Sequence, residues 1–257
     1  MDISSAIQIA KKVLTADLAC EEGDFDLDGI HVYTAREIEG ARRFPLRENS
    51  LNAATFGKGV VFSCSSNRLQ WVKDVLSRRT RDDVFSAPVI SLMEEYVSRD
   101  GQTIIGPDLK YVCGHDTYQR LEPPRDIETK LVEGDGIKAL YTHTGFGNAL
   151  DHVYNPERPT VMAVTAASGD EIIGIAGVSA DAPEMYQLGV DVVPGYRNKG
   201  IGSFLVSRLT ESILDMGKVP YYSTWANNIG SRRLALAVGY RPVWVEVYAN
   251  KVSPGLG

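Results

Sequence analysis

The residues best suited to do chemistry are the glycines and cations of one short segment, Val192-Val-Pro-Gly-Tyr-Arg-Asn-Lys-Gly-Ile-Gly202. Apolar residues before Pro194 predict a strand, and a helical period after Gly200 predicts a helix. The first amides of a helix have no intrahelical partners, and they present the positive end of its dipole at one point. Glycine lets phosphate oxygens approach these amides because it has no Cβ. The segment therefore predicts an anion site, to which Arg197 and Lys199 add positive charge.

Two other phosphate-binding motifs do not fit this segment. The sequence contains no G-x-x-x-x-G-K-[ST], which disfavours a P-loop nucleotide hydrolase. The dinucleotide fingerprint needs a third glycine where this chain has Leu205. A nucleotide-dependent oxidoreductase is therefore the least favoured alternative.

The elements that must position the anion site follow the order β-β-β-α-β-α-β. Ser168-Gly169-Asp170 is typical of a turn between the first two strands, and Pro194 ends the third strand. The predicted bounds are strands 160–166, 171–179 and 185–193, helix 200–216, strand 221–226, helix 231–238 and strand 243–249.

The first part of the chain indicates a separate mixed α/β region. Hydrophobic spacing predicts a helix over 4–19, a strand over 59–64, a helix capped by Asn67 and another that starts near Ser86. The pair Pro123-Pro124 cannot continue a helix and follows a polar stretch. We therefore expect an N-terminal α/β domain over 1–122 and a second domain over 123–252.

Composition narrows the classes of protein and of partner. Hydrophobic residues make up 44% of the 257 residues and charged residues 23%, which is typical of a globular chain. A net charge of −6 argues against a nucleic-acid partner. No apolar run reaches the ~20 residues that span a membrane. The three widely spaced cysteines favour a reducing cytoplasm over disulfides or zinc.

One acidic segment resembles the start of a calcium-binding loop. Asp24-x-Asp26-x-Asp28-Gly29 has the right spacing, but Ala35 stands where the loop needs its bidentate Glu. The segment that follows, 30–33, reads as a strand. We therefore expect a solvated acidic loop and no bound metal.

Two motifs in order resemble a known family. The pattern V-x-P-x-x-R-x-x-G-x-G over 192–202, followed by Asn228-x-x-Ser231 and by Gly239-Tyr240, resembles the two CoA motifs of the GNAT N-acetyltransferase superfamily. The resemblance covers roughly residues 125–250. It implies a mixed α/β fold with a central, mixed, splayed sheet, and points to a bacterial subgroup with an extra N-terminal α/β half. That half is either a degenerate copy of the same fold or a substrate lid.

The resemblance implies acetyl-CoA, or another acyl-CoA, as co-substrate. Val190 and Val192 would bind pantetheine through their main chains, and the amide of Val190 would donate to the thioester carbonyl. Asn228 and Ser231 would contact the pantetheine arm or cap the next helix. The diphosphate would be held by the amides of Arg197, Asn198, Lys199, Gly200, Ile201, Gly202 and Ser203.

The resemblance also implies transfer of acetyl to a primary amine by direct attack in a ternary complex. Many members carry a Tyr acid where this chain has Ala235, so Tyr221, Tyr222, Ser223 or water must protonate the thiolate. Some carry a Glu base at the position of Tyr186, and Glu184 lies two residues earlier. We take Glu184, Tyr186 and Tyr221 as candidate catalytic residues.

The expected partner is a small-molecule or peptide amine, and a homodimer is possible on the same resemblance. The alternative, suggested by Ala235, is a CoA-binding or ligand-sensing module without turnover.

Overall fold

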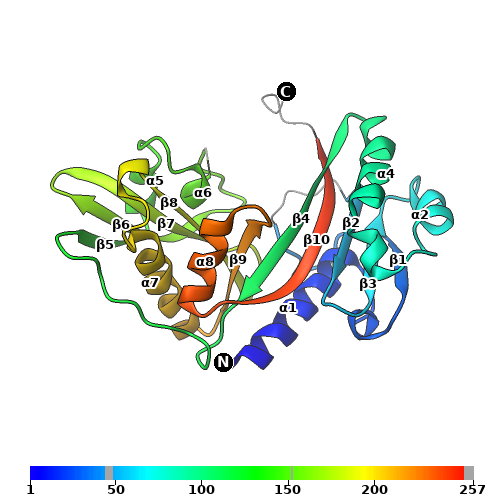
Figure 1. Cartoon of the computed structure of the whole chain (residues 1–257), viewed down its shortest axis with the longest axis horizontal. Helices are drawn as coiled ribbons and strands as arrows, with labels where there is room; N and C mark the ends of the chain where they lie inside the picture. Colours follow the sequence, from blue (N-terminus) through cyan, green and yellow to red (C-terminus); the bar gives the residue numbers. More distant parts are fainter. Residues whose placement is uncertain (44–48, 152, 252–257) are drawn as a thin grey trace. The chain divides into compact units, whose positions relative to one another are not determined.

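The computed structural model describes residues 1–43, 49–151 and 153–251, and the chain divides into two compact units (Figure 1). The first unit comprises residues 1–10 and 111–242, and the second comprises residues 11–110 and 243–257. The predicted domains, 1–122 and 123–252, stay a prediction, because compact units need not coincide with sequence domains. Helix α1 (Ile3–Leu18) and strand β10 (Arg241–Lys251) contribute residues to both units.

The first unit is built on a mixed sheet with strand order β9-β8-β7-β6-β5. Neighbouring strands from β5 to β8 are antiparallel, whereas β8 and β9 are parallel. The mixed α/β fold with an open, mixed sheet agrees with the expected fold class. The strands are β5 (Glu128–Glu133), β6 (Thr160–Ser168), β7 (Glu171–Ser179), β8 (Met185–Val192) and β9 (Val219–Trp225).

Helices cover both faces of this sheet. A Cβ added to Gly174 would contact the side chains of Leu205 and Ile201 in α7 (Ile201–Asp215). A Cβ added to Gly177, three residues further along β7, would instead meet the backbone of α6 (Gly147–Leu150). Because successive strand residues point to opposite faces, α6 and α7 lie on opposite sides of the sheet. Helix α8 (Ile229–Val238) packs against α7 and β9, and α5 (Gly136–Leu140) against β5 and β6.

The predicted order of elements after residue 160 is confirmed, with ends that shift by at most two residues. The helix near Ser86 is also confirmed, as α4 (Ala87–Ser98) with a proline in its first turn. The predicted cap by Asn67 is wrong. Helix α2 (Leu69–Val75) begins after Arg68, and no side chain bonds to its first amides.

The second unit contains a five-stranded sheet in the order β1-β3-β2-β10-β4. Helices α2 and α4 cover one face over a core that includes Phe62, Val72, Met93 and Val247. The remaining elements are β1 (Ile30–Thr34), β2 (Leu51–Thr55), β3 (Val60–Cys64), β4 (Gln102–Val112), the 3-10 turn η1 (Asp24–Asp26) and α3 (Arg81–Val84).

The acidic loop that resembles a calcium site is not fully solvated. Asp24 is 6% exposed, accepts a hydrogen bond from the Glu21 amide at 3.1 Å, and lies 3.5 Å from His31 Nδ1. Its hydrogen bond to Tyr33 helps to raise the pKa of that phenol to about 12. Within residues 1–43, 49–151 and 153–251, no three His, Cys, Asp or Glu side chains gather as a metal site.

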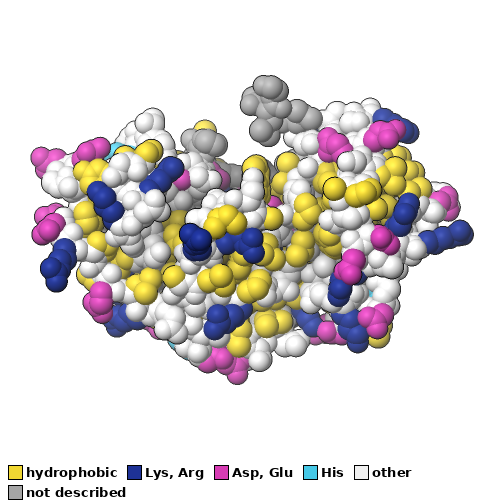
Figure 2. All heavy atoms as spheres, viewed as in Figure 1, with side chains coloured by type: hydrophobic (Ala, Val, Ile, Leu, Met, Phe, Trp, Pro, Cys, Tyr) yellow, Lys and Arg dark blue, Asp and Glu magenta, His cyan; other side chains and the backbone are white. Residues whose placement is uncertain are grey.

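The described residues also show the character of the helices, the state of the cysteines and the distribution of surface charge. None of their helices combines the length and the apolar character that crossing a bilayer requires. The three cysteines are buried free thiols, and burial raises the pKa of Cys20 to about 12. On the face shown in Figure 2, basic and acidic side chains are interspersed.

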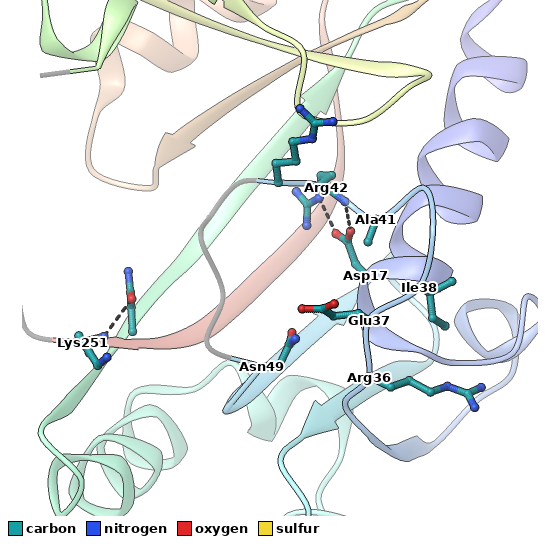
Figure 3. A pocket seen from close by; sticks show the side chains of 10 residues that line it. Asp17, Arg36, Glu37, Ile38, Ala41, Arg42, Asn49 and Lys251 are labelled. Carbon is teal, nitrogen blue, oxygen red and sulfur yellow. Dashed lines mark hydrogen bonds and ion pairs between the residues drawn. The ribbon is translucent and has the colours of Figure 1, made fainter. Parts of the chain in front are cut away.

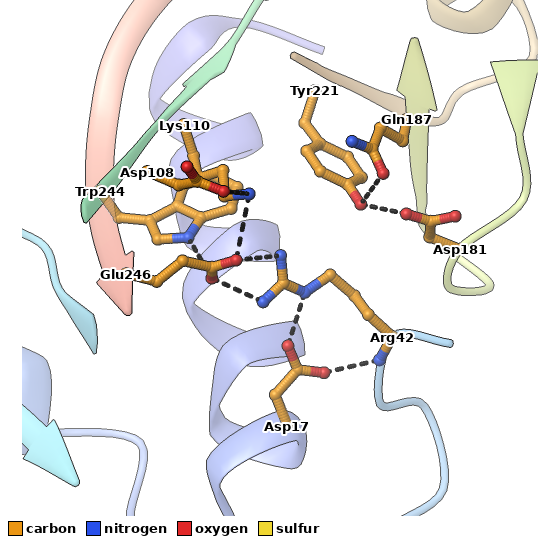
Figure 4. A network of polar contacts seen from close by, with 9 residues as sticks. All are labelled: Asp17, Arg42, Asp108, Lys110, Asp181, Gln187, Tyr221, Trp244 and Glu246. Carbon is orange, nitrogen blue, oxygen red and sulfur yellow. Dashed lines mark hydrogen bonds and ion pairs between the residues drawn. The ribbon is translucent and has the colours of Figure 1, made fainter. Parts of the chain in front are cut away.

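A buried charge cluster joins α1, β4 and β10 within the second unit (Figure 4). Arg42 donates to both carboxylate oxygens of Asp17, at 2.6 Å from its amide and 2.5 Å from Nε. Its Nη2 donates to Glu246 at 2.8 Å, and Lys110 Nζ lies 3.1 Å from the other Glu246 oxygen. Asp108 completes the cluster, 3.4 Å from Lys110 Nζ. The cluster therefore holds three acidic groups against two bases.

Burial raises the pKa of Asp108, and the nearby Glu246 raises it further, while Lys110 opposes this. Because the folded state keeps this proton to higher pH than the unfolded chain does, the free energy of unfolding falls as pH rises above about 4. We expect Asp108→Asn to raise the free energy of unfolding at neutral pH and to flatten this decline. Denaturant titrations of both proteins between pH 4 and pH 8 measure the two slopes. An Asp108→Asn protein with an unchanged slope would contradict the assignment.

Candidate functional site

Strands β8 and β9 separate part-way along their length. Their parallel ladder begins at Met185↔Val219 and ends at Leu188↔Tyr222. Strand β8 nevertheless continues to Val192 and β9 to Trp225. We call the point after Leu188↔Tyr222 the fork, and the unpaired lengths of the two strands its arms.

The main chains of Val190 and Val192 point into the fork. The Val193 amide donates to the Ile173 carbonyl of β7 at 2.9 Å, so odd-numbered residues of β8 bond toward β7. Even-numbered residues point the other way, as the Glu184 carbonyl confirms by accepting from the Val219 amide at 2.8 Å. Beyond the fork, this direction leads to the gap that β9 has left.

The loop after β8 leads to the uncapped start of α7. The 3-10 turn η2 (Pro194–Tyr196) is followed by Asn198 at φ +62° and by Gly200 at φ +80°. No side chain caps Gly200, and the Phe204 amide donates to its carbonyl at 3.0 Å. The amides of Ile201, Gly202 and Ser203 therefore precede the first helical bond. The start of α7 therefore lies next to the β8 arm of the fork.

The two cations of the loop have defined positions. Arg197 Nε donates to the Val192 carbonyl at 2.9 Å, so this guanidinium folds back on the end of β8. Lys199 Nζ lies 5.0 Å from the centre of the Tyr196 ring. Both side chains are exposed and leave the loop positively charged.

The two glycines of the motif have different structural roles. Gly200 adopts a left-handed conformation, and a Cβ there would have no atom within 4 Å. A Cβ on Gly202 would instead lie 3.1 Å from Leu234 Cδ1 and 3.5 Å from Val192 Cγ2. Gly202 thus allows α7 to pack closely against α8 and β8, whereas Gly200 keeps the approach to the amides open.

Asn228 and Ser231 lie at the start of α8. Asn228 Oδ1 accepts from the Ser231 amide at 3.0 Å, which is an N-cap bond. Ser231 Oγ lies 2.8 Å from the hydroxyl of Tyr222, the last paired residue of β9. Burial raises the pKa of Tyr222, so this phenol holds its proton. The helix-cap alternative for Asn228 is therefore confirmed, and its contact with a cofactor stays a prediction.

The three candidate catalytic residues do not share one face of the sheet. Tyr186 lies in register with Val190, whose Cγ2 is 3.8 Å from the Cβ position of Gly202, so it points to the α7 side. Tyr221 pairs with Gln187 on the α6 side, one residue before the fork. Glu184 precedes β8, and its carbonyl anchors the start of β9.

Tyr221 belongs to a buried polar group that sequence reasoning missed (Figure 4). Its hydroxyl donates to Asp181 Oδ2 and lies 3.1 Å from Gln187 Oε1. Asp181 is fully buried, and its Oδ1 accepts from Arg158 Nε at 2.6 Å. We call Tyr221, Asp181, Gln187 and Arg158 the Tyr221 network. Arg158 and Asp181 have no sequence signal, because they meet only through the fold.

Asp191 fixes α6 on its face of the sheet. Its Oδ2 accepts from the amides of Asn148 at 2.7 Å and Ala149 at 3.0 Å. The paired residues Gly177 and Gly189 face α6 from the sheet. A Cβ on Gly177 would stand 2.0 Å from the Ala149 carbonyl oxygen, and one on Gly189 would stand 1.7 Å from the Asn148 carbonyl oxygen. By strand alternation, Asp191 is expected on the face opposite to Tyr186. That orientation is correct, and the residue positions α6.

A separate depression of about 580 Å³ lies within the second unit (Figure 3). Arg36, Arg42, Arg43 and Lys251 line it together with Asp17 and Glu37. None of the candidate residues chosen from the sequence lines it.

The fork lies in the part of the chain that is similar to a known protein family. Residues 131–240 match the model of the acetyltransferase (GNAT) family. No curated protein sequence matches the chain.

Solved structures of low sequence identity resemble part of the fold. A GCN5-related N-acetyltransferase from Kribbella flavida shares 18% identity at a TM-score of 0.45, covering 63% of this chain and 65% of that one. A GCN5-related N-acetyltransferase-like protein from Streptococcus suis shares 16% sequence identity at a TM-score of 0.47, and the match covers 63% of this chain and 68% of that one. An acetyltransferase from Salmonella typhimurium, solved with its cofactor acetyl-CoA, shares 15% sequence identity at a TM-score of 0.35. The match covers 52% of this chain and 98% of that one. This chain thus spans less than two thirds of the Kribbella flavida protein.

Proposed function

We propose that this chain, whose residues 131–240 match the model of the acetyltransferase (GNAT) family, transfers acetyl from acetyl-CoA to a primary amine. The proposal rests on one observation: the fork is joined by the loop after β8 to the uncapped start of α7. A long ligand with an anionic middle and an extended arm fits both features at once. The acceptor class is a small-molecule or peptide amine, and we place the reaction in the cytoplasm, with a homodimer as a possible assembly.

The residues present fit an acyl-CoA on structural grounds. The open approach at Gly200 and the amides up to Ser203 suit a diphosphate, which needs several N–H donors rather than one strong charge. The main chain of Val190 and the amide of Val192 offer the pantetheine arm the bonds that β9 does not make beyond the fork, whereas the Val192 carbonyl already accepts from Arg197 Nε. Asn198, Lys199 and Arg197 would border the diphosphate, and Asn228 and Ser231 the arm.

This chain's residues would then hold the reacting groups in place. Acetyl-CoA supplies an activated thioester. The Val190 amide would donate to its carbonyl oxygen and stabilise the negative charge that grows there as the amine attacks. Holding amine and thioester together removes much of the entropic barrier of a bimolecular step. No covalent enzyme intermediate is needed.

Proton transfer is assigned to the three candidates Glu184, Tyr186 and Tyr221. Tyr221 has the strongest geometric support, because it lies next to the fork and is held by a buried network. We expect Tyr221→Phe to lower kcat by tenfold or more, within the usual range of general acid–base effects. Tyr186→Phe and Glu184→Gln should lower it less. Steady-state rates for the three variants, with their dissociation constants for acetyl-CoA, separate chemistry from binding.

The proposal is tested by following free thiol release from acetyl-CoA with a broad panel of amines. Release above the hydrolysis background with at least one amine is the expected result. Ala235, which is buried on α8, supports the alternative of a CoA-binding module without turnover. Tight acetyl-CoA binding with no release on any amine would favour that alternative.

A further inference from the structure

The Tyr221 network is built at the fork rather than at a distance from it. The pair Gln187↔Tyr221 directly precedes Leu188↔Tyr222, after which the strands part. Both side chains project to the α6 side, opposite to the face on which α7 begins. The buried Tyr221 side chain therefore starts one pair before the gap, on the side away from the anion site.

The hydrogen bonds of the network can be satisfied with two different numbers of protons. Tyr221 has one hydroxyl proton, and the acceptors within its reach include Asp181 Oδ2 and Gln187 Oε1. With Asp181 ionised, the phenol donates to Asp181. With Asp181 protonated, its O–H donates to the phenol, which turns its own proton to Gln187. A proton added to the network thus leaves no donor unsatisfied.

Arg158 keeps the acceptors in place in both states. Its Nε donates to Asp181 Oδ1 at 2.6 Å and its Nη2 to Gln187 Oε1 at 2.9 Å. The bond from Arg158 also identifies the Gln187 oxygen as the atom that faces the phenol. Burial raises the pKa of Asp181, although Arg158 opposes this, and the burial favours uptake of a proton.

We propose that Asp181, held by Arg158 and acting through Tyr221, receives the proton that the acceptor amine loses during acyl transfer. This rests on the proposed function. As the amine nitrogen bonds to the carbonyl carbon, it passes a proton to Tyr221 Oη, and Tyr221 passes its own to Asp181 Oδ2. The carbon–sulfur bond breaks, and its electron pair leaves on sulfur, which takes a proton from water. Asp181 later returns its proton through Tyr221 to water. Tyr221 is thus a catalytic residue, and Asp181 its positioning residue.

A double-mutant cycle on the full chain tests this relationship. Thiol release from acetyl-CoA is measured with the best amine of the panel or, if none reacts, with hydroxylamine. We expect Asp181→Asn and Tyr221→Phe each to lower kcat by tenfold or more, and the double variant to fall no further. KM for acetyl-CoA should change less than threefold. Asp151→Asn is the matched control, because Asp151 contacts the same Arg158 at 2.6 Å but not Tyr221.

Each outcome of the cycle decides the proposal. Effects that multiply, an unchanged rate in Asp181→Asn, or an equal loss in Asp151→Asn would overturn it and leave the acetyltransferase proposal intact. Wild-type protein that binds acetyl-CoA but releases no thiol would overturn both. If Asp181→Asn does not fold, Asp181→Asn with Arg158→Gln removes both buried charges together and replaces it in the cycle.

Discussion

Replacing Gly189 by alanine is expected to destabilise the protein by roughly 3 kcal/mol, at the upper end of ordinary overpacking costs. The added Cβ would stand 1.7 Å from the Asn148 carbonyl oxygen, and that contact involves backbone, which cannot rotate away. Helix α6 would have to leave the sheet and lose the hydrogen bonds that its amides donate to Asp191. Urea unfolding of the wild type and the variant measures the loss.

The control for this change is Gly195→Ala. Gly195 lies in the loop after β8, and a Cβ there would meet no atom within 4 Å. We expect a change in stability within about 0.5 kcal/mol, as for ordinary surface positions. If both variants unfolded at the same urea concentration as the wild type, α6 would not be seated on β8 as described.

Replacing Gly200 by aspartate is expected to weaken acetyl-CoA binding by roughly ten- to a hundredfold. A carboxylate about 5 Å from one phosphate charge costs about 1–3 kcal/mol, between the limits for water and for a protein surface. The open approach at Gly200 is the feature that this carboxylate would occupy. Calorimetric titration with acetyl-CoA measures the change in dissociation constant.

The matched control is Gly200→Asn, which has the same size and a similar tolerance of φ +80° but no charge. It should lose much less affinity than the aspartate variant. Equal losses in the two variants would mean that backbone strain, and not a bound anion, explains the effect. Wild-type affinity in both would place the ligand elsewhere.

The elements that position the site could be predicted where local pattern decides them. Helix α7 follows from Ile201, Leu205, Leu209 and Ile213, which recur at the helical period and are all buried. Strand β4 was not predicted, because Gly106-Pro107 within it is typical of a turn. A Cβ on Gly106 would lie 2.7 Å from the backbone carbonyl oxygen of Glu246. This position is therefore glycine because a neighbouring strand passes close to it, which local pattern cannot reveal.

The candidate site was predictable in its anion-binding loop but not in its proton-handling group. The glycines and cations of the loop are adjacent in sequence, so their spacing is itself the signal. The fork depends on where two strands stop pairing, and Arg158 meets Asp181 across 23 positions. Strand alternation does place Gln187 and Asp191 on one face of the sheet, but it cannot show which buried groups they contact on that face.

We expect the amides from the end of β8 into α7 to bind the diphosphate of acetyl-CoA. Selective ¹⁵N labelling of the 24 glycines gives a direct measurement by amide NMR during titration with acetyl-CoA. Diphosphate binding at these amides predicts large shifts for Gly200 and Gly202, and none for Gly57 and Gly101 in the second unit. Stationary signals from Gly200 and Gly202 at saturating acetyl-CoA would contradict it.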